Sequence, residues 1–402
     1  MARPETIVVV GFSLAGLRAA ETLRREGFDG RLICVGEESE LPYDRPPLSK
    51  EILRGEWEPG RTALRHDGYD ALGLELHLGQ RARALDGRRR RVELEDGASL
   101  EYDGLVVATG ARARSLPALE DLPGVHRLRT LADALAIERE LVAGPRVVIV
   151  GAGFIGCEIA ASCRARGLRV CVIDPLEAPL ERALGVELGG CVAALQRDHG
   201  VVLELQRGVD RLEGWGRVEA VRLDDGRRLD ADLVIVGVGA EPATEWLVGS
   251  GVELDDGVLC DACSRTALPG VVAAGDVARA YHPGQRRHLR HEHWTNAADQ
   301  GPSAARALLH GAEARSYVPI PFVWSDQFDV KLQLAGDVRN HELQAVVWGS
   351  LEERRFTLLC GRGGRLTGVL CFNRSRDCMR YRALIEAGCS WEEALAHAVE
   401  SS

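Results

Sequence analysis

Lysine is almost absent from this chain, and one of its two lysines ends the short segment LPYDRPPLSK, residues 41–50. Lysine and arginine together number 50, and lysine stands only at positions 50 and 331, so 48 of these residues are arginines (50 − 2). An ammonium is a compact point charge, whereas a guanidinium is a broad planar fork. Lys50 therefore indicates a site that needs a small cation, and a solvated turn residue is the alternative.

A glycine-rich turn follows the first apolar segment. Residues 6–10, TIVVV, form a continuous apolar run, which is typical of a strand buried on both faces of a parallel sheet. A predicted helix and a second strand (31–36) follow, and Glu37 then stands where a carboxylate can bind an adenosine ribose. The three positions of the dinucleotide-binding pattern G-x-G-x-x-G are here Gly11, Ser13 and Gly16. The Ser13 hydroxyl could donate to a phosphate oxygen, and a strand–helix turn without a ligand is the alternative.

The same pattern returns 140 residues later (151 − 11). The apolar strand RVVIV, residues 146–150, leads into GAGFIG and a helix, and a further strand ends at Asp174. The pattern glycines are Gly151, Gly153 and Gly156. Two such units rarely arise by chance in one chain, and they indicate electrons passing between two bound dinucleotides. Asp174 favours NADH over NADPH, because a carboxylate accepts from the ribose 2′-hydroxyl and repels a 2′-phosphate.

Smaller signals lie between and after the two motifs. A predicted strand ends at ATG, residues 108–110, and residues 231–242, ADLVIVGVGAEP, repeat that pattern. The segment GVVAAGDVA places a carboxylate at another strand end, where it can accept from the ribityl hydroxyls of a flavin. Each segment alone could be a loop between buried strands, but their order along the chain favours a flavin site. The candidate residues are Thr109, Gly110, Gly239, Gly275 and Asp276.

Size and composition limit the classes of protein. A chain of 402 residues is too long for one ordinary core, so two or three domains are expected. The net charge of −10 argues against nucleic-acid binding, and no apolar run approaches the roughly 20 residues that cross a bilayer. Only five residues precede TIVVVG, which leaves no room for a signal peptide, and the eleven cysteines have no regular spacing. We therefore expect a cytoplasmic protein with reduced thiols and no membrane association.

Over essentially its whole length the chain resembles the FAD-dependent NADH:ferredoxin reductases of bacterial oxygenase systems, the putidaredoxin reductase and biphenyl dioxygenase ferredoxin reductase type. The family also includes reductases that serve rubredoxin. The most specific shared segments are RPPLSK and WSDQ, and further ones are LVVATGARAR, LRTLADA, VVIVGAGFIGCEIA, VVAAGDVA, RHEHWTNAADQG and FNRSRDCMRYR. Ser13 and Phe12 depart from the residues usual in the family at these positions.

The resemblance implies an α/β fold. Two Rossmann-like dinucleotide-binding domains, arranged as in glutathione reductase, would precede a C-terminal α+β domain. The FAD-binding domain would comprise residues 1–113 and 241–319, the NAD-binding domain residues 114–240, and the C-terminal domain residues 320–402. The chain supports the insertion by itself, because the second glycine motif lies between two flavin-type signals.

The resemblance also implies roles for two residues in catalysis. Lys50 would lie near flavin N5, where a cation stabilises the negative charge of the reduced ring. Glu158, two residues after Gly156, would pair with Lys50 and keep it charged in a poorly solvated site. The other flavin or nicotinamide contacts that the family implies are Ala15, Arg45, Pro47, Ala82, Arg129, Ile155, Arg290, Glu292, Trp294 and Trp324.

An alternative exists for Arg129, and the segment RHEHWTN has a predicted geometry. Arg129 would reach the flavin pyrophosphate, and an ion pair with Glu120 or Asp133 is the alternative. In RHEHWTN, strand alternation predicts one face with the flavin contacts and an opposite face with His291 and His293.

Several other signals are better explained without chemistry. His288, His291, His293 and Glu292 could suggest a metal site, but the predicted alternation separates them, so we expect no metal. The pair Cys260 and Cys263 has redox spacing, but it follows a strand rather than opening a helix. Related disulfide reductases carry their cysteine pair soon after the first motif, where this chain has none. The run GRRRR, residues 87–91, reads as a solvated hairpin turn.

These observations together predict an enzyme, a ferredoxin–NAD(+) reductase. NADH would reduce FAD, and FAD would pass single electrons to a [2Fe–2S] ferredoxin that serves a P450 or a ring-hydroxylating dioxygenase. The alternatives are a rubredoxin reductase, an NADH oxidase, or a flavoprotein of the apoptosis-inducing-factor kind with a binding role. We expect a monomer or weak homodimer.

Ferredoxins are usually acidic, so docking would need a local basic patch. Arg112 and Arg114 form one candidate patch. A second comprises Arg374, Arg376, Arg380 and Arg382. Ion pairing of the second group with Asp377 or Glu386 of its own domain is the alternative.

Overall fold

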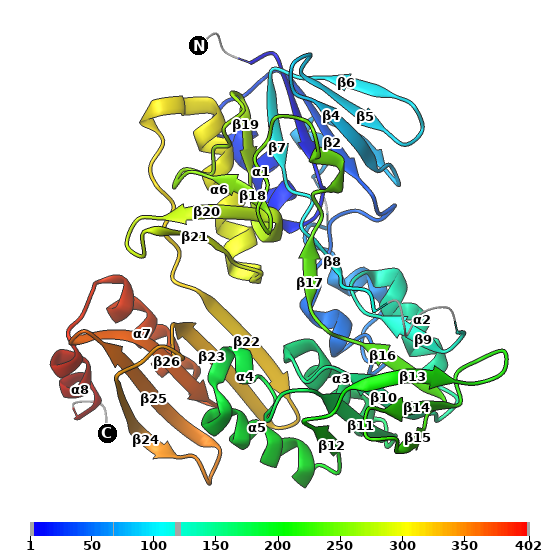
Figure 1. Cartoon of the computed structure of the whole chain (residues 1–402). Coiled ribbons are helices and arrows are strands. Elements are labelled where there is room, and N and C mark those ends of the chain that lie inside the picture. Colours follow the sequence, from blue (N-terminus) through cyan, green and yellow to red (C-terminus); the bar gives the residue numbers. More distant parts are fainter. Residues whose placement is uncertain (1–3, 67, 117–121, 400–402) are drawn as a thin grey trace. The chain divides into compact units, whose positions relative to one another are not determined.

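The computed structural model describes residues 4–66, 68–116 and 122–399. The chain forms two compact units, each assembled from three separate segments (Figure 1). Unit 1 comprises Met1–Asp44, Thr62–Arg112 and Glu241–Pro319, and unit 2 comprises Arg45–Arg61, Ala113–Ala240 and Ile320–Ser402. Apart from a shift of one residue at Ala113, this grouping differs from the predicted boundaries in two respects. Residues 45–61 belong to unit 2, and the C-terminal segment shares that unit with the second glycine motif.

Unit 1 is built on a five-stranded parallel sheet. In sheet order its strands are β19 (Val271–Ala273), β7 (Gly104–Val107), β1 (Thr6–Val10), β2 (Arg31–Gly36) and β3 (Leu74–Leu78). Successive residues of β1 enter two different cores: Ile7 and Val9 share one core with Leu17 of helix α1 (Leu14–Arg25), while Val8 and Val10 join the other core. Both faces of the strand are therefore buried, which explains its continuous apolar sequence.

Helices and smaller sheets complete unit 1. The helices α1 (Leu14–Arg25) and α6 (Trp294–His310) pack against each other on one face of the sheet. One antiparallel sheet comprises β4 (Ala82–Asp86), β5 (Arg91–Leu94) and β6 (Ser99–Glu101), and another sheet comprises β18 (Val258–Cys260), β20 (Ala278–His282) and β21 (Arg287–Arg290). Short 3₁₀ turns are η2 (Pro59–Thr62), η3 (Asp70–Leu72), η5 (Glu245–Leu247), η6 (Gly275–Val277) and η7 (Gly311–Glu313), with η2 ending at the unit boundary. Residues 87–90 of the run GRRRR form the turn between β4 and β5, as predicted, and Arg91 begins β5.

Unit 2 contains a second five-stranded parallel sheet. In sheet order its strands are β12 (Val202–Leu205), β11 (Arg169–Asp174), β10 (Arg146–Val150), β16 (Leu233–Val236) and β9 (Val125–Arg127). This sheet differs from the first in its outer strand: β9 precedes the other strands of its sheet in the chain, whereas β19 follows those of its own. Its helices are α2 (Leu131–Leu141), α3 (Phe154–Ala165), α4 (Glu181–Leu184) and α5 (Val186–Asp198). The antiparallel strands β13 (Val209–Glu213), β14 (Ala220–Leu223) and β15 (Arg228–Asp230) correspond to β4–β6 of unit 1. The strands β8 (Ala111–Ala113) and β17 (Ala240–Pro242) carry the chain between the units.

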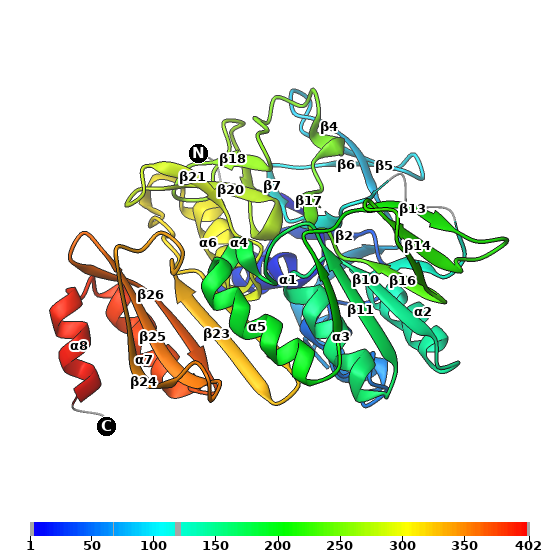
Figure 2. The same cartoon turned by 60° about the horizontal axis from the view of Figure 1, so that its bottom comes forward.

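The C-terminal segment adds an antiparallel sheet to unit 2. In sheet order its strands are β22 (Phe322–Gln327), β23 (Val330–Gly336), β26 (Arg365–Phe372), β25 (Arg355–Arg362) and β24 (Leu343–Ser350). The helices α7 (Ser375–Glu386) and α8 (Trp391–Val399) follow. Residues of the edge strand β22 contact both α3 and α5, and the yellow-to-orange sheet lies beside the green helix α5 in both views (Figure 1 and Figure 2). Residues 320–399 therefore pack against the second glycine-motif region.

Candidate active site

The most buried charge pair in the described structure joins Lys50 to Glu158. Lys50 Nζ lies 3.2 Å from Glu158 Oε2, and the two side chains are only 7% and 4% exposed. Ser49 Oγ donates to the same oxygen at 2.5 Å, and Ser325 Oγ donates to Glu158 Oε1 at 2.8 Å. A buried ion pair is stable only where further hydrogen bonds satisfy its remaining atoms. Three donors surround this carboxylate, as a buried anion requires.

One face of helix α3 holds the segment that carries Lys50. Glu158, Ser162 and Arg166 recur every four residues and so lie on one side of the helix and its C-terminal end. Ser162 Oγ donates to the backbone oxygen of Ser49 at 2.7 Å, and Arg166 Nη1 donates to that of Leu53 at 2.8 Å. These bonds explain why residues 45–61 group with unit 2.

The start of the Lys50 segment is also held within unit 2. Pro46 and Pro47 open the turn η1 (Pro46–Ser49), and the N–H of Lys50 donates to Pro47 O. Arg45 Nη1 donates to the backbone oxygen of Arg129 at 2.5 Å. Proline fixes φ, so the turn is stiff.

Arg129 precedes the N-terminus of helix α2. Asp133, one of its suggested ion-pair partners, accepts from the N–H groups of Arg129 and Thr130, and Thr130 completes a capping box with it. Glu120, the other suggested partner, lies outside the described residues.

The two glycine turns have matching backbone geometry. Gly11 has φ +98° and Gly151 has φ +108°, and a Cβ at these positions would lie 2.1 Å from Ala108 O and 2.3 Å from Gly237 O. Only glycine fits such a turn. The last glycines of the motifs, Gly16 and Gly156, have a Cβ position 2.0 Å from the oxygen of the first glycine.

The middle position of the second motif differs from these in leaving space for a ligand. Gly153 has φ −73°, and a Cβ there would meet no atom within 4 Å. Ser13 is extended, with φ −112°, and makes no capping bond, so its Cβ does not disturb the turn. The helices α1 and α3 begin here without a capping side chain or an acidic residue in the first turn. Free N–H groups at a helix N-terminus bind phosphate, so both turns fit a dinucleotide pyrophosphate.

The two carboxylates at the ends of strands β2 and β11, Glu37 and Asp174, differ in their surroundings. The Glu37 side chain is half exposed and lies 3.0 Å from Arg112 and 3.8 Å from Arg81. Asp174 is buried, and its carboxylate accepts the N–H groups of Ala152 at 2.6 Å and Leu176 at 2.8 Å. Asp174 thus also orders the second glycine turn, while each of its oxygens keeps a lone pair for a ribose hydroxyl.

Two further residues expected to hold the flavin, Gly275 and Thr109, lie beside the first glycine turn. A Cβ on Gly275, which has φ +77°, would lie 3.0 Å from Ala15 Cβ, so η6 and the start of α1 meet. Asp276 belongs to η6. Thr109 Oγ1 donates to Ala243 O at 2.8 Å, and Trp294 Nε1 donates to Asp44 Oδ1 at 2.6 Å.

The remaining candidates are more scattered. Ala82 is buried in β4, Ile155 is 46% exposed at the start of α3, and Trp324 lies in β22 with its ring 6.0 Å from that of Phe322. Gly110 and Gly239 have positive φ. The structure thus groups most of the flavin candidates in unit 1, and Lys50 and the nicotinamide candidates in unit 2.

The predicted strand alternation through RHEHWTN is wrong. Strand β21 ends at Arg290 and helix α6 begins at Trp294, because Asn296 Nδ2 donates to the His291 oxygen and bends the chain into the helix. Glu292 forms an ion pair with Arg290, and the rings of His291 and His293 stack with centroids 5.9 Å apart. The described residues contain no group of three or more His, Cys, Asp or Glu side chains placed to hold a metal ion.

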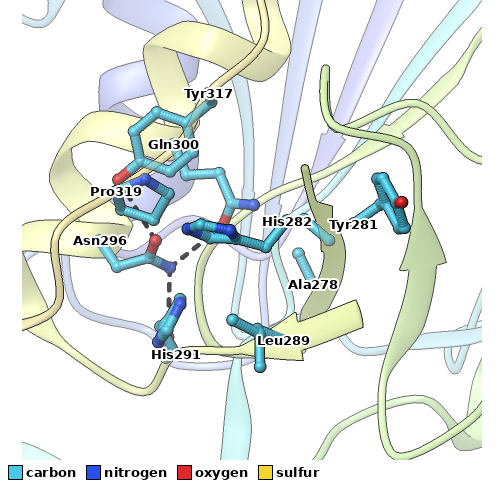
Figure 3. Close-up of a pocket in the computed structure, with 10 residues that line it drawn as sticks. Ala278, Tyr281, His282, Leu289, His291, Asn296, Gln300, Tyr317 and Pro319 are labelled. Atoms are coloured by element: carbon cyan, nitrogen blue, oxygen red, sulfur yellow. Dashed lines mark hydrogen bonds between the residues drawn. The ribbon is translucent and has the colours of Figure 1, made fainter. Parts of the chain in front are cut away.

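Sequence reasoning missed a small cavity beside this bend (Figure 3). Tyr317 Oη donates to Asn296 Oδ1, Asn296 Nδ2 donates to Gln300 Oε1, and Gln300 Oε1 also accepts from Gly275 N–H. This network supports the Gly275 turn from helix α6. Burial lowers the pKa of His291, which lines the cavity, to about 4.

Two family models cover the chain. One, described as pyridine nucleotide-disulphide oxidoreductase, matches residues 5–301, and another, described as reductase C-terminal, matches residues 322–400. The chain belongs to the pyridine nucleotide-disulphide oxidoreductase family, and it is an FAD- and NAD(H)-dependent oxidoreductase. The predicted fold class is thereby confirmed.

Named relatives narrow the subgroup. The chain is 38% identical to rhodocoxin reductase of Rhodococcus erythropolis over 94% of this chain and 89% of that one. It is 39% identical to the ferredoxin–NAD(+) reductase component of the anthranilate 1,2-dioxygenase system of Burkholderia cepacia, over 96% and 95%. The reductase in the crystal structure of a covalent putidaredoxin reductase–putidaredoxin complex matches with a TM-score of 0.91 and 32% identity, over 99% and 98% of the two chains.

Proposed function

We propose that this enzyme is an NADH:ferredoxin reductase that supplies electrons to an oxygenase. The main observation in support is the buried Lys50–Glu158 pair. Glu158 lies in the first turns of helix α3, directly after the second glycine turn. A pyrophosphate on that turn brings a dinucleotide to the helix that holds the cation. The relatives named above, which include reductase components of oxygenase systems, support the same function.

Residues of the chain have four tasks in this reaction. Gly11, Ser13, Gly16 and Glu37 would bind the FAD pyrophosphate and adenosine, and Gly151, Gly153, Gly156 and Asp174 would bind those of NADH. FAD, when bound, accepts two electrons from NADH and releases them singly. Lys50 holds a positive charge where negative charge develops, and Glu158 orients that charge in a site that excludes water. Residues 41–51, where related disulfide reductases carry their cysteine pair, contain no cysteine, so the electrons go to an outside acceptor.

The partner is a [2Fe–2S] ferredoxin that serves a P450 or a ring-hydroxylating dioxygenase, and the reaction takes place in the cytoplasm. No helix in the described ranges is long and apolar enough to cross a bilayer. Within this proposal, residues 1–113 and 241–319 bind FAD, residues 114–240 bind NADH, and residues 320–402 form a C-terminal α+β domain. A rubredoxin or oxygen as the main acceptor is the competing activity.

Anaerobic stopped-flow absorbance tests the proposal. The purified protein should contain FAD, NADH should bleach it within seconds, and a [2Fe–2S] ferredoxin should then be reduced. Oxygen consumption without ferredoxin measures the oxidase alternative, and rubredoxin is the parallel acceptor. Extracted FMN, or fast turnover with oxygen alone, would contradict the proposed function.

Nucleotide preference is measured in the same assay. Asp174 is buried at the strand end, so a 2′-phosphate would meet its negative charge. We expect kcat/KM for NADH to exceed that for NADPH by about tenfold or more. Equal values would show that Asp174 serves only to order the glycine turn.

A further inference from the structure

A closed ring of buried hydrogen bonds includes the carboxylate that holds Lys50. Ser325 and Gln327 lie on strand β22, Gln196 lies on helix α5, and all three residues are at most 1% exposed. Gln327 Nε2 donates to Ser325 Oγ at 3.0 Å, and Gln196 Nε2 donates to Gln327 Oε1 at 2.9 Å. Gln196 Nε2 also donates to the backbone oxygen of Cys157 at 3.3 Å. The ring therefore leaves helix α3 at Glu158 and returns to it at Cys157.

The backbone oxygen of Cys157 sets the direction of every bond in this ring. A carbonyl oxygen only accepts, so the Gln196 group that faces it must be the NH₂ group. That NH₂ group also faces Gln327, which must present its oxygen there and its own NH₂ group to Ser325. The Ser325 oxygen then accepts, and its single proton remains for Glu158.

We infer that Ser325 is a positioning residue for the Lys50–Glu158 pair, with its hydroxyl aimed at the carboxylate by Gln327 and Gln196. Ser325 holds Glu158 Oε1, which leaves Oε2 to accept from Lys50 and Ser49. We call Glu158, Ser325, Gln327, Gln196 and the Cys157 oxygen the carboxylate ring. The effect of the carboxylate ring on the rate of flavin reduction rests on the proposed function, whereas the effect of the ring on the position of Lys50 does not.

Removal of the Ser325 hydroxyl would leave a buried carboxylate oxygen without its donor. An unsatisfied buried anion is costly, so Glu158 would turn toward Lys50 or recruit water. Either change moves the ammonium or alters its surroundings. The C-terminal segment thereby controls the geometry of a charge that belongs to the nicotinamide site.

The scarcity of lysine allows a direct test by NMR. In oxidised protein labelled with ¹³C- and ¹⁵N-lysine, only Lys50 and Lys331 give signals, and Lys331→Arg assigns them. Ser325→Ala should shift or broaden the Lys50 signals and leave those of Lys331 unchanged. Ser325→Thr keeps a hydroxyl and should restore the wild-type Lys50 signals.

The isosteric change Gln327→Glu tests the direction of the ring without removing a donor to Glu158. A carboxylate at position 327 would compete with Glu158 for the one Ser325 proton, so the Lys50 signals should change as in Ser325→Ala. Two variants on strand β24 serve as controls. Ser350→Ala removes a hydroxyl that accepts from the N–H of Glu353, and Gln344→Glu makes the same isosteric change at an exposed residue. Both controls should leave the Lys50 signals unchanged.

Kinetics give the second readout. Ser325→Ala and Gln327→Glu should slow flavin reduction by NADH by roughly 10- to 100-fold with little change in the Kd for NADH, and Ser325→Thr should recover most of the rate. Unchanged Lys50 signals in both variants would overturn the inference, and should Ser325→Ala not fold, Gln327→Glu alone decides it. The two inferences can fail separately. If both variants change the Lys50 signals but the wild-type protein fails to reduce ferredoxin, the proposed function is refuted and the role of the carboxylate ring is confirmed.

Discussion

Lys50 is an ammonium buried at 5% exposure in a chain whose cations are otherwise almost all guanidinium groups. It pairs with Glu158, and the second lysine, Lys331, lies half exposed beside Asp326. Lys331 therefore serves as a control for Lys50, because Lys50 occupies the proposed active site and Lys331 a surface of the same unit.

Lys50→Met should slow flavin reduction by NADH by roughly 10²-fold, because the variant loses the cation that stabilises developing negative charge. FAD content should change little, and Glu158→Gln should act in the same direction with a smaller effect. Lys331→Met is the control and should reduce flavin at the wild-type rate. Wild-type rates in Lys50→Met would refute the catalytic role of the ammonium.

His291 should make the protein sensitive to mild acid. Burial is the main cause that lowers its pKa from 6.5 to about 4, with contributions from His293, His282 and Arg287. Below about pH 6.5 the unfolded chain binds a proton that the folded ring does not bind, so stability falls as the pH falls toward 4. His291→Gln should reduce the loss of unfolding free energy between about pH 6.5 and 5 by up to about 2 kcal/mol.

Chemical unfolding at several pH values measures this effect. His66→Gln, at an exposed histidine, is the matched control and should keep the wild-type pH dependence. Equal slopes for His291→Gln and wild type would show that the ring exchanges protons freely in the folded state.

At the scale of the elements, the glycine turns separate two functions within a few residues. A Cβ at Gly156 would lie 2.0 Å from the Gly151 oxygen, whereas a Cβ at Gly153 would enter open space. One glycine therefore permits the close approach of helix and strand, and the other leaves room for the ligand backbone.

Gly156→Ala should lower the free energy of unfolding by about 1–3 kcal/mol, because the added methyl collides with backbone. Gly153→Ala should keep wild-type stability, since φ −73° suits alanine, but raise the KM for NADH by roughly tenfold. Thermal melts and NADH titrations distinguish the two. Destabilisation by Gly153→Ala, or unimpaired stability of Gly156→Ala, would contradict the geometry of the turn.

At the scale of the whole molecule, the question is where an acidic carrier docks on a chain of net charge −10. Arg374 and Arg380 lie 2.7 and 3.8 Å from Asp377, so the alternative of internal pairing holds for these two arginines. Arg382 stacks over Phe322, and Arg112 pairs with Glu37 and Glu245. Arg376 is exposed on helix α7, which leaves its charge the most accessible of the C-terminal group.

Arg376→Glu should raise the KM for ferredoxin by about three- to tenfold and weaken the salt dependence of association. Activity with ferricyanide should remain at the wild-type level, because a small acceptor needs no docking surface. The double variant Arg88→Glu with Arg89→Glu, at the exposed β4–β5 turn, carries a larger charge change and should leave the ferredoxin KM nearly unchanged. The reverse result would place the docking surface at the hairpin of unit 1.

The sequence by itself determined the features that depend on local backbone chemistry. Gly11, Gly16, Gly151 and Gly156 predict both nucleotide turns. At these positions a positive φ or a close approach of the backbone excludes other residues. The continuous apolar strands announced two parallel sheets for the same kind of reason, since burial on both faces leaves no polar position. The two lysines identified Lys50 before any contact was known.

Only the tertiary structure decided which distant side chains meet. Lys50 and Glu158 are 108 residues apart, and Glu158 and Ser325 are 167 apart, so no periodicity relates them. The bonds from Ser162 and Arg166 place residues 45–61 in unit 2, and that placement follows from packing rather than from local sequence. The end of β21 at Arg290 was missed because the deciding bond comes from Asn296, inside the next helix. Long-range hydrogen bonds form only once the chain has packed, and so they are absent from any local pattern.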